Sequence, residues 1–345
     1  MINSIQILRG IAALLVVYAH IEFLNVKVGS FGVDIFFIIS GFIIAYMVNK
    51  DTSAFLYRRV VRIIPLYYSM TILTAALAIA KPAWFKHVIV NAETMLKSLL
   101  FIPYRLHGSG PVLSLGWTLN LEMFFYFVTF LCILAFGQKK SIWACQVILT
   151  IVVIVSYFVR PDSYEVAFLS QGIILEFVLG TLLYYFWKKN PFEHQAAAKA
   201  GLIFLGLLAL PFMFYADRYL EMERFVKFGI PALLLTNAFL LMEPLIRKEN
   251  RFFKTAILIG DSSYAMYLAH PFIIYAFIRL VFAKMPTDNI FIQFIELLIT
   301  LAAVCIISIL MHQWYEKPVM KLLRLRLDGR FDKKKKGTVP AKPVV

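Results

Sequence analysis

The stretch SIQILRGIAALLVVYAHIEF, residues 4–23, decides the fold, because it has the pattern of a membrane-spanning helix with two misplaced polar residues, Arg9 and His20. The two residues are eleven positions apart, close to three full helical turns, so their side chains share one face. The helical rise separates them by about 16 Å, roughly half the hydrocarbon thickness of a bilayer. With Arg9 at the cytoplasmic surface, His20 is expected beyond the midplane. An ionisable group at that depth must face the bundle interior or a wet cavity.

The composition places the rest of the chain in the same class. Hydrophobic residues make up 61% of the sequence, against the ~45–50% apolar content of a soluble domain. Apolar runs long enough to cross a bilayer recur along the whole chain, which predicts an all-α polytopic membrane protein, a bundle of about ten transmembrane helices. The candidate spans are residues 5–24, 31–49, 63–80, 117–136, 141–159, 166–187, 200–216, 228–246, 257–279 and 290–312.

The distribution of basic residues predicts the orientation. The net charge of +15 would suit a nucleic-acid partner in a soluble protein, but cytoplasmic loops of membrane proteins collect Lys and Arg, so no nucleic acid is expected. Of the 35 basic residues, 24 fall on the side of the N-terminus, which predicts that both termini are cytoplasmic. We expect one membrane domain over residues 1–320 and a basic, disordered tail over 321–345. Residues 81–115 are long and mixed enough to contain a re-entrant or interfacial helix.

Two carboxylates in the apolar spans are candidates to orient His20. Asp34 begins the second span at about the expected depth of His20, and a carboxylate beside an imidazole fixes its tautomer and raises its basicity. A helix N-cap is the alternative for Asp34. Glu122 lies one and a half turns into the fourth span and needs a partner from another helix, in a functional site or in a structural polar cluster. We expect His20, Asp34 and Glu122 to meet in one pocket. Ser40 and Gly41, at mid-span, are expected to permit close helix packing.

Three arginines precede Pro65 at the start of the third span. Arg59 and Arg62 are three residues apart and can point the same way, as a pair of guanidinium groups binding phosphate oxygens would. An ordinary positively charged flank is the alternative reading for Arg58, Arg59 and Arg62.

The ninth span contains Tyr267 and His270, followed by Pro271, which predicts a kink that frees a backbone carbonyl. We consider Trp117, Tyr267 and His270 as candidate substrate-binding residues. A satisfied core histidine is the alternative for His270. The three cysteines fall inside predicted spans without metal-ligand spacing, so no metal site is expected.

Six motifs, in order, resemble those of the membrane-bound acyltransferase 3 family, and in particular its exopolysaccharide acetyltransferase branch. The resemblance runs from about residue 4 to residue 318. The motifs are the arginine–x10–histidine of Arg9 and His20, GVDIFFIISGF (32–42), RRVVRIIPLYY (58–68), GWTLNLEMFFYF (116–127), GDSSYAMYLAH (260–270) and YEKP (315–318).

The resemblance implies a bacterial inner-membrane enzyme that moves an acyl group from cytoplasmic acyl-CoA to a hydroxyl of an exported or cell-surface carbohydrate. It implies that His20 is the essential catalytic histidine and that Arg9, Arg59 and Arg62 are needed for activity. Acetyl-CoA is expected as the donor substrate, with no permanently bound cofactor. The sequence shows no soluble domain after the membrane part, so the acyl group is expected to be handled within the bundle or by a partner.

The residues themselves fit this chemistry. Arginines at the cytoplasmic face suit the phosphates of acyl-CoA, and an extended pantetheine arm would bring the thioester near His20. A neutral imidazole there can act as general base on a sugar hydroxyl or as a nucleophile that forms an acyl-histidine. The alternative is a secondary transporter or lipid-linked glycan flippase with a buried relay of histidine and carboxylates. Against it, the sequence has no internal inverted repeat.

Overall fold

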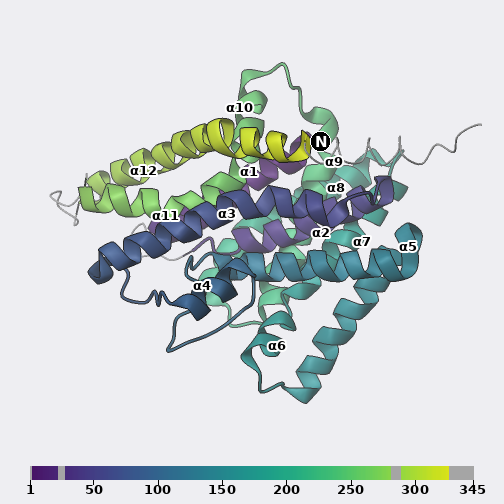
Figure 1. Ribbon diagram of the computed structural model, residues 1–345. Coiled ribbons are helices and arrows are strands. Elements are labelled where there is room, and N and C mark those ends of the chain that lie inside the picture. The colour runs from purple at the N-terminus through teal and green to yellow at the C-terminus, as the bar shows by residue number, and fades with distance from the viewer. Residues whose placement is uncertain (1, 22–27, 281–288, 326–345) are drawn as a thin grey trace, which may run out of the picture.

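A computed structural model describes residues 2–21, 28–280 and 289–325 (Figure 1). The secondary structure of these residues is helical, and the pairing of Leu106 with Ser109 is an isolated bridge. The α-helices are α1 (Asn3–Ile21), α2 (Gly32–Lys50), α3 (Phe55–Ala80), α4 (Ala92–Leu99), α5 (Gly116–Val159), α6 (Tyr164–Leu169), α7 (Ile174–Lys189), α8 (Ala196–Tyr219), α9 (Ile230–Leu241), α10 (Arg251–Asp261), α11 (Ser263–Leu280) and α12 (Ile290–Met311). The short 3-10 and π-helical segments are η2 (Pro82–Trp84), η3 (Phe225–Gly229), η4 (Glu243–Leu245) and η5 (His312–Glu316).

The described residues contain seven helical segments that are long and apolar enough to cross a membrane, and two shorter apolar helices. One of the seven, α5, bends at Gly137, where φ is 71°, and therefore holds two of the predicted spans, 117–136 and 141–159. The predicted span 257–279 is divided, because α10 ends at Asp261 and α11 begins at Ser263. The chain is thus a multi-pass helical membrane protein, as predicted. The number of ten spans and the cytoplasmic placement of both termini stay predictions.

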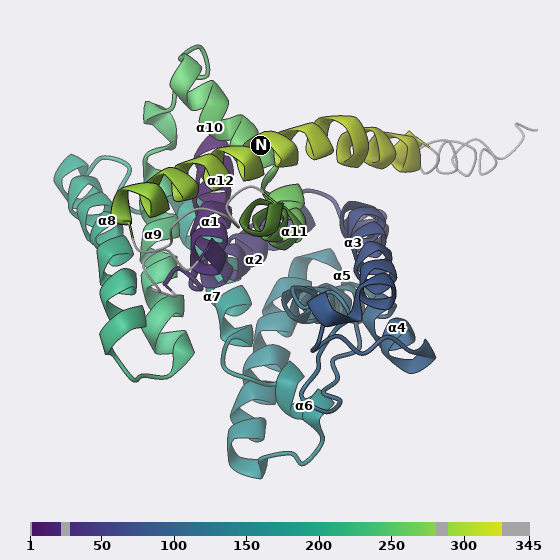
Figure 2. The ribbon, with the colours of Figure 1, turned by 90° about the vertical axis from the view of Figure 1, so that its left-hand side faces the viewer.

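Helices α1 and α2 form the centre of the bundle. In their most apolar windows 61% of α1 and 72% of α2 is buried, against 17% of α8 and 22% of α5. Figure 2 shows α1 and α2 between α8 and α9 on one side and α3 and α5 on the other. The outer helices expose large apolar side chains, such as Leu134 on α5 and Phe204 on α8, as surfaces that face lipid do.

Helices α2 and α7 approach each other closely at a pair of glycines. A Cβ atom on Gly41 would collide with the carbonyl of Phe177, and one on Gly180 would collide with the carbonyl of Ile38. Small residues let membrane helices approach to backbone contact, so the packing role predicted for Gly41 is confirmed. The neighbouring side chain of Ser40 points instead into a polar cavity.

We expect Gly180→Val to destabilise the bundle, because the new side chain must push α2 and α7 apart. Overpacking of this kind costs about 1–3 kcal/mol or more of unfolding free energy. The matched control is Gly201→Ala on α8, where a Cβ atom meets nothing within 4 Å. Thermal unfolding of the purified variants measures the difference. Equal melting temperatures for Gly180→Val and the parent would contradict close packing at this site.

The segment of residues 81–115, which contains α4, folds back against helix α3 of the bundle. The hydroxyls of Tyr67 and Tyr68 donate hydrogen bonds to the carbonyls of Ser98 and Leu99 at the end of α4, at 3.0 and 2.7 Å. The Tyr67 hydroxyl also lies next to Gly116, the first residue of α5. Tyr67 is twelve residues, or about 18 Å, into α3. Helix α5 therefore starts at the middle depth of α3 rather than at its end, as Figure 1 also shows.

The C-terminal segment differs in part from its prediction. Residues 317–325 continue the helix that follows η5, so the first five residues of the predicted tail 321–345 are helical. The other residues of that tail, 326–345, lie outside the described residues.

Candidate active site

A small cavity of about 80 Å³ lies between α1, α2, α3, α5 and α11. We call it the arginine cavity, because guanidinium groups from two helices face it. Its polar lining residues are Arg9, Ser40, Arg59, Arg62, Thr118, Glu122, Tyr126, Ser263, Tyr264 and Tyr267. The structure thus brings together five of the residues predicted from sequence, namely Arg9, Arg59, Arg62, Glu122 and Tyr267.

Local contacts hold Arg9 in place on α1. Its side chain is buried, and its guanidinium donates a 3.1 Å hydrogen bond to the amide oxygen of Gln6, one turn earlier. The Gln6 amide in turn donates to the carboxylate of Asp261 at the end of α10. Because α1 and α10 pack closely at Gly10 and Gly260, this chain of side chains fixes the direction of Arg9.

The three arginines that precede Pro65 have different environments. Arg58 pairs with Asp51 at 2.9 Å on the surface, where hydrogen bonds from Ser53, together with Arg58, lower the pKa of the Asp51 carboxyl. Arg59 is buried, and its Nε atom has no hydrogen-bond partner among the described residues. Arg62 is half-buried and lines the arginine cavity with Arg59. A charged flank accounts for Arg58, whereas Arg59 and Arg62 form an inward-facing pair.

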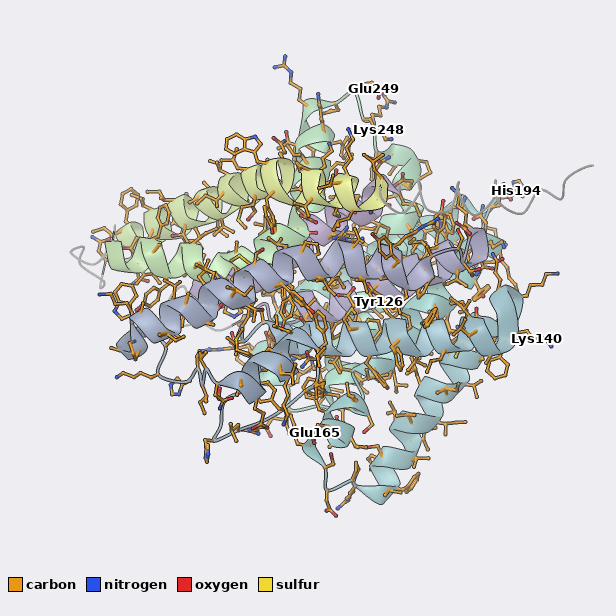
Figure 3. The ribbon with its side chains drawn as sticks, viewed as in Figure 1. Tyr126, Lys140, Glu165, His194, Lys248 and Glu249 are labelled. Atoms are coloured by element: carbon orange, nitrogen blue, oxygen red, sulfur yellow. The ribbon has the colours of Figure 1, made fainter. Side chains whose placement is uncertain are left out.

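Glu122 is the carboxylate of the arginine cavity. It accepts hydrogen bonds from the hydroxyls of Ser40, at 3.1 Å, and of Tyr126, one turn further along α5. The Arg59 guanidinium lies over the Tyr126 ring at 5.9 Å from its centroid. Figure 3 shows Tyr126 in the interior of the bundle, whereas Lys140 and His194 lie at its periphery.

The charges lining the arginine cavity do not balance. Three guanidinium groups face one carboxylate, and the unpartnered Nε of Arg59 is a buried donor. Buried charges and donors are costly unless they are paired. The arginine cavity is therefore suited to an anion with several oxygens, since guanidinium groups bind such oxygens in pairs.

His20 lies at the other end of α1, on its last turn. Its side chain is exposed, so the expectation of a deeply buried imidazole is wrong: α1 ends at Ile21, one residue later. The ring contacts the fully buried His270 of α11, with centroids 4.7 Å apart in an edge-to-face arrangement. His270, a candidate substrate-binding residue, is thus the ring neighbour of His20.

Backbone hydrogen bonds set the tautomers of both imidazoles. His20 Nδ1 lies 2.8 Å from the carbonyl oxygen of Val16, and His270 Nδ1 lies 3.2 Å from that of Met266. A carbonyl only accepts, so in each neutral ring Nδ1 carries the proton and Nε2 keeps its lone pair. Nε2 of His20 is therefore the basic atom.

The expectation that Asp34 orients His20 is wrong. Asp34 is fully buried and accepts two hydrogen bonds from Arg224, at 2.9 and 2.6 Å. Glu176 of α7 is also fully buried, and neither of its oxygens has a hydrogen-bond donor among the described residues. Asp34 therefore forms an ion pair with Arg224, separate from His20. The carbonyl of Val16 orients the imidazole instead.

Glu122 does not meet His20 or Asp34 as predicted. It shares the arginine cavity with Arg9, and His20 lies about 16 Å further along α1. The reason is the start of α5 in the middle of the bundle, which moves Glu122 toward the end where α1 begins. Trp117 packs half-buried against the core on the first turn of α5 and does not line the arginine cavity.

Side chains of α11 connect the arginine cavity to His20. Tyr267 lines the cavity and bonds to the hydroxyl of Thr118 at 2.8 Å. Its ring centroid lies 6.1 Å from that of His270, which in turn contacts His20. One face of α11 thus runs from the arginines to the imidazole pair.

Sequence reasoning missed several of these residues. The sequence predicts a packing role for Ser40 together with Gly41, whereas the hydroxyl of Ser40 donates a hydrogen bond to Glu122. Glu176 is the one charged residue in the apolar run IILEFVLG, and this isolation is the sequence feature that could have identified it. Arg224 stands among other charged residues directly before η3, and nothing in the sequence distinguishes it.

The geometry defines a multi-pass membrane protein with an arginine-lined cavity and an exposed imidazole toward opposite ends of one helix. An acyltransferase domain family matches residues 2–313, so the chain belongs to this acyltransferase family, and the resemblance read from its motifs is confirmed. It is a membrane acyltransferase.

The relatives include enzymes named for carbohydrate modification. The chain is 33% identical over 260 residues to the exopolysaccharide production protein ExoZ of Rhizobium meliloti, covering 72% of this chain and 77% of that protein. It is 24% identical to the putative peptidoglycan O-acetyltransferase YrhL of Bacillus subtilis, covering 90% of this chain and 54% of YrhL. It is equally similar to the O-acetyltransferase OatA of Staphylococcus aureus, covering 91% of this chain and 56% of OatA. The chain thus spans little more than half of YrhL and OatA. No solved structure matches it.

Proposed function

We propose that the protein is an O-acetyltransferase of the bacterial inner membrane that moves an acetyl group from cytoplasmic acetyl-CoA to a hydroxyl of an exported or cell-surface carbohydrate. The observation that carries the proposal is the placement, along α1, of an arginine-lined cavity and an imidazole whose Nδ1 is held by the Val16 carbonyl, which leaves Nε2 as the basic atom. The names of ExoZ, YrhL and OatA support a carbohydrate acceptor.

The arginine cavity would hold the phosphate-bearing part of the donor. A volume of about 80 Å³ takes only a fragment of coenzyme A, so Arg59 and Arg62 would bind phosphate oxygens while the pantetheine arm extends beyond the cavity. The face of α11 with Tyr267 and His270 leads from there to His20. An extended arm along this face would bring the thioester carbonyl to the imidazole.

His20 would then supply the base. In direct transfer, Nε2 takes the proton of the sugar hydroxyl as its oxygen attacks the thioester carbonyl, and returns that proton to the departing thiolate of coenzyme A. In the two-step route, Nε2 attacks the carbonyl and the thiolate leaves, which gives an acyl-histidine. The sugar oxygen then displaces the imidazole, and the proton that the sugar hydroxyl loses is taken up by the thiolate of coenzyme A. Both routes need the tautomer that the Val16 carbonyl selects.

The arginine pair offers a test of donor binding. We expect Arg59→Lys and Arg62→Lys to weaken coenzyme A binding about tenfold or more, because an ammonium lacks the planar fork that binds two phosphate oxygens. The matched control is Arg58→Lys, since Arg58 pairs with Asp51 outside the cavity. Titration calorimetry of the purified variants measures the affinity. Parental affinity in both cavity variants would show that these arginines only set topology.

A further inference from the structure

A buried carboxyl group next to Asp34 lacks an ordinary hydrogen-bond donor. Glu176, on the first turn of α7, is fully buried, and no donor among the described residues reaches either of its oxygens. Its carboxyl lies within hydrogen-bonding contact of the carboxyl of Asp34 on α2. Gly229 of η3 lies against the same side chain, since a Cβ atom there would be 3.0 Å from Cγ of Glu176. An ionised Glu176 would therefore be a buried charge that faces a second carboxylate.

The contacts of Arg224 show which of the two carboxyl groups is ionised. Arg224 donates to both oxygens of Asp34, from Nε at 2.9 Å and from Nη2 at 2.6 Å. Two parallel hydrogen bonds of this kind are typical of a guanidinium and an ionised carboxylate. Among the described residues, Asp34 and Arg224 are the charged groups that face Glu176, so one positive charge serves two carboxyl groups. A proton on Glu176 removes the surplus negative charge and supplies Asp34 with a further donor.

The two carboxyl groups lie where the first turn of α2 packs against α1. Asp34 belongs to that turn. At Gly32, on the same turn, the two helices are in close contact, because a Cβ atom there would be 2.9 Å from Cγ2 of Val16. The carbonyl of Val16 orients the imidazole of His20. The carboxyl pair is therefore connected, through the start of α2, to the residue that orients His20.

We propose that Glu176 carries a proton, which it donates in a hydrogen bond to the ionised Asp34, and that this pair, together with Arg224, positions the first turn of α2 and thereby His20. The three side chains then form one neutral unit, which suits the apolar interior of the bundle. Glu176 is a positioning residue, since it acts through α2 and not on the reacting atoms. The shared proton is independent of the proposed function, whereas its effect on acetyl transfer rests on that function.

Two matched variants, Glu176→Gln and Asp34→Asn, test which group is ionised. The amide introduced by Glu176→Gln can still donate to Asp34, so this variant should melt within about 2 °C of the parent and transfer acetyl groups within about twofold of the parental rate. Asp34→Asn removes the ionised partner of Arg224 and should lower the melting temperature by roughly 5 °C or more. It should also lower kcat about tenfold or more and leave the affinity for coenzyme A unchanged, because the arginine cavity does not include Asp34.

The reverse result, a stable Asp34→Asn and a destabilised Glu176→Gln, would assign the proton to Asp34 and overturn the proposal. Equal destabilisation of both variants would show that both groups are ionised, and stabilisation by sodium ions that Glu176→Gln lacks would identify a cation site instead. Parental kcat in Asp34→Asn would contradict the positioning role.

Infrared spectroscopy measures the proton itself, without turnover. The difference spectrum between the parent and Glu176→Gln should contain the carbonyl stretch of a protonated carboxyl group. Carboxylate bands in its place would overturn the proposal. Failure of the proposed function would differ, since the parent would then transfer no acetyl groups and still show the band of the protonated carboxyl group.

Discussion

Replacement of His20 by alanine is expected to lower acyl transfer by about 10²–10⁴-fold, the usual contribution of a positioned general base. The substitution removes the one imidazole nitrogen that the Val16 carbonyl leaves free to take the proton of the acceptor. Because the side chain is exposed on the last turn of α1, its loss leaves no cavity in the core. NMR of acetyl groups on the product measures the effect, with membrane protein levels determined in parallel.

Donor binding provides the control for His20→Ala. The arginine cavity lies about 16 Å away along α1, so the affinity for coenzyme A should match that of the parent. His194→Ala, an exposed histidine at the periphery, should retain full activity (Figure 3). Activity of His20→Ala within a few-fold of the parent would exclude a catalytic role for this residue.

Loss of the carboxylate in the arginine cavity should have the second large effect. Glu122→Ala leaves three guanidinium groups without a facing anion and removes the hydrogen-bond acceptor of Ser40 and Tyr126. We expect the free energy of unfolding to fall by about 2–4 kcal/mol. Coenzyme A should then raise the melting temperature of Glu122→Ala more than that of the parent, because its phosphates replace the missing negative charge. Thermal unfolding with and without coenzyme A measures both effects.

Glu122→Gln separates charge from shape. The amide oxygen can still accept from Ser40, so a role in hydrogen bonding alone predicts parental stability and parental response to coenzyme A. A role as counter-ion predicts that Glu122→Gln resembles Glu122→Ala in its stronger response to coenzyme A. An equal melting-temperature shift for the parent and both variants would show that the arginine cavity does not bind the coenzyme.

The class of fold could be predicted from the sequence, because lipid forces apolar residues into long uninterrupted runs. The depth of each residue could not be predicted in the same way. A span drawn from hydropathy is assumed to start at a surface, but α5 starts where Tyr67 and Tyr68 bind the end of α4, in the middle of the bundle. That one feature moves Glu122 from the neighbourhood of His20 to that of Arg9.

Charge and spacing predicted part of the site. Arg59 and Arg62 turn inward together, as residues three apart on a helix can. Interaction partners contributed by distant segments could not be predicted from the sequence. Arg224, which binds Asp34, is 190 residues away, and the backbone carbonyls that orient His20 and His270 leave no mark in the sequence. The sequence predicts that buried carboxylates orient His20, because it shows side chains and not backbone geometry.

The most direct test of the central claim uses acetyl-CoA labelled in its acetyl group, supplied to sealed proteoliposomes that contain the protein and a carbohydrate acceptor. The proposed function predicts that label appears in the carbohydrate, is released by mild alkali as an O-acetyl ester is, and is absent with His20→Ala. Movement of the intact sugar across the membrane without incorporation of label would contradict it, and would identify the protein as a transporter.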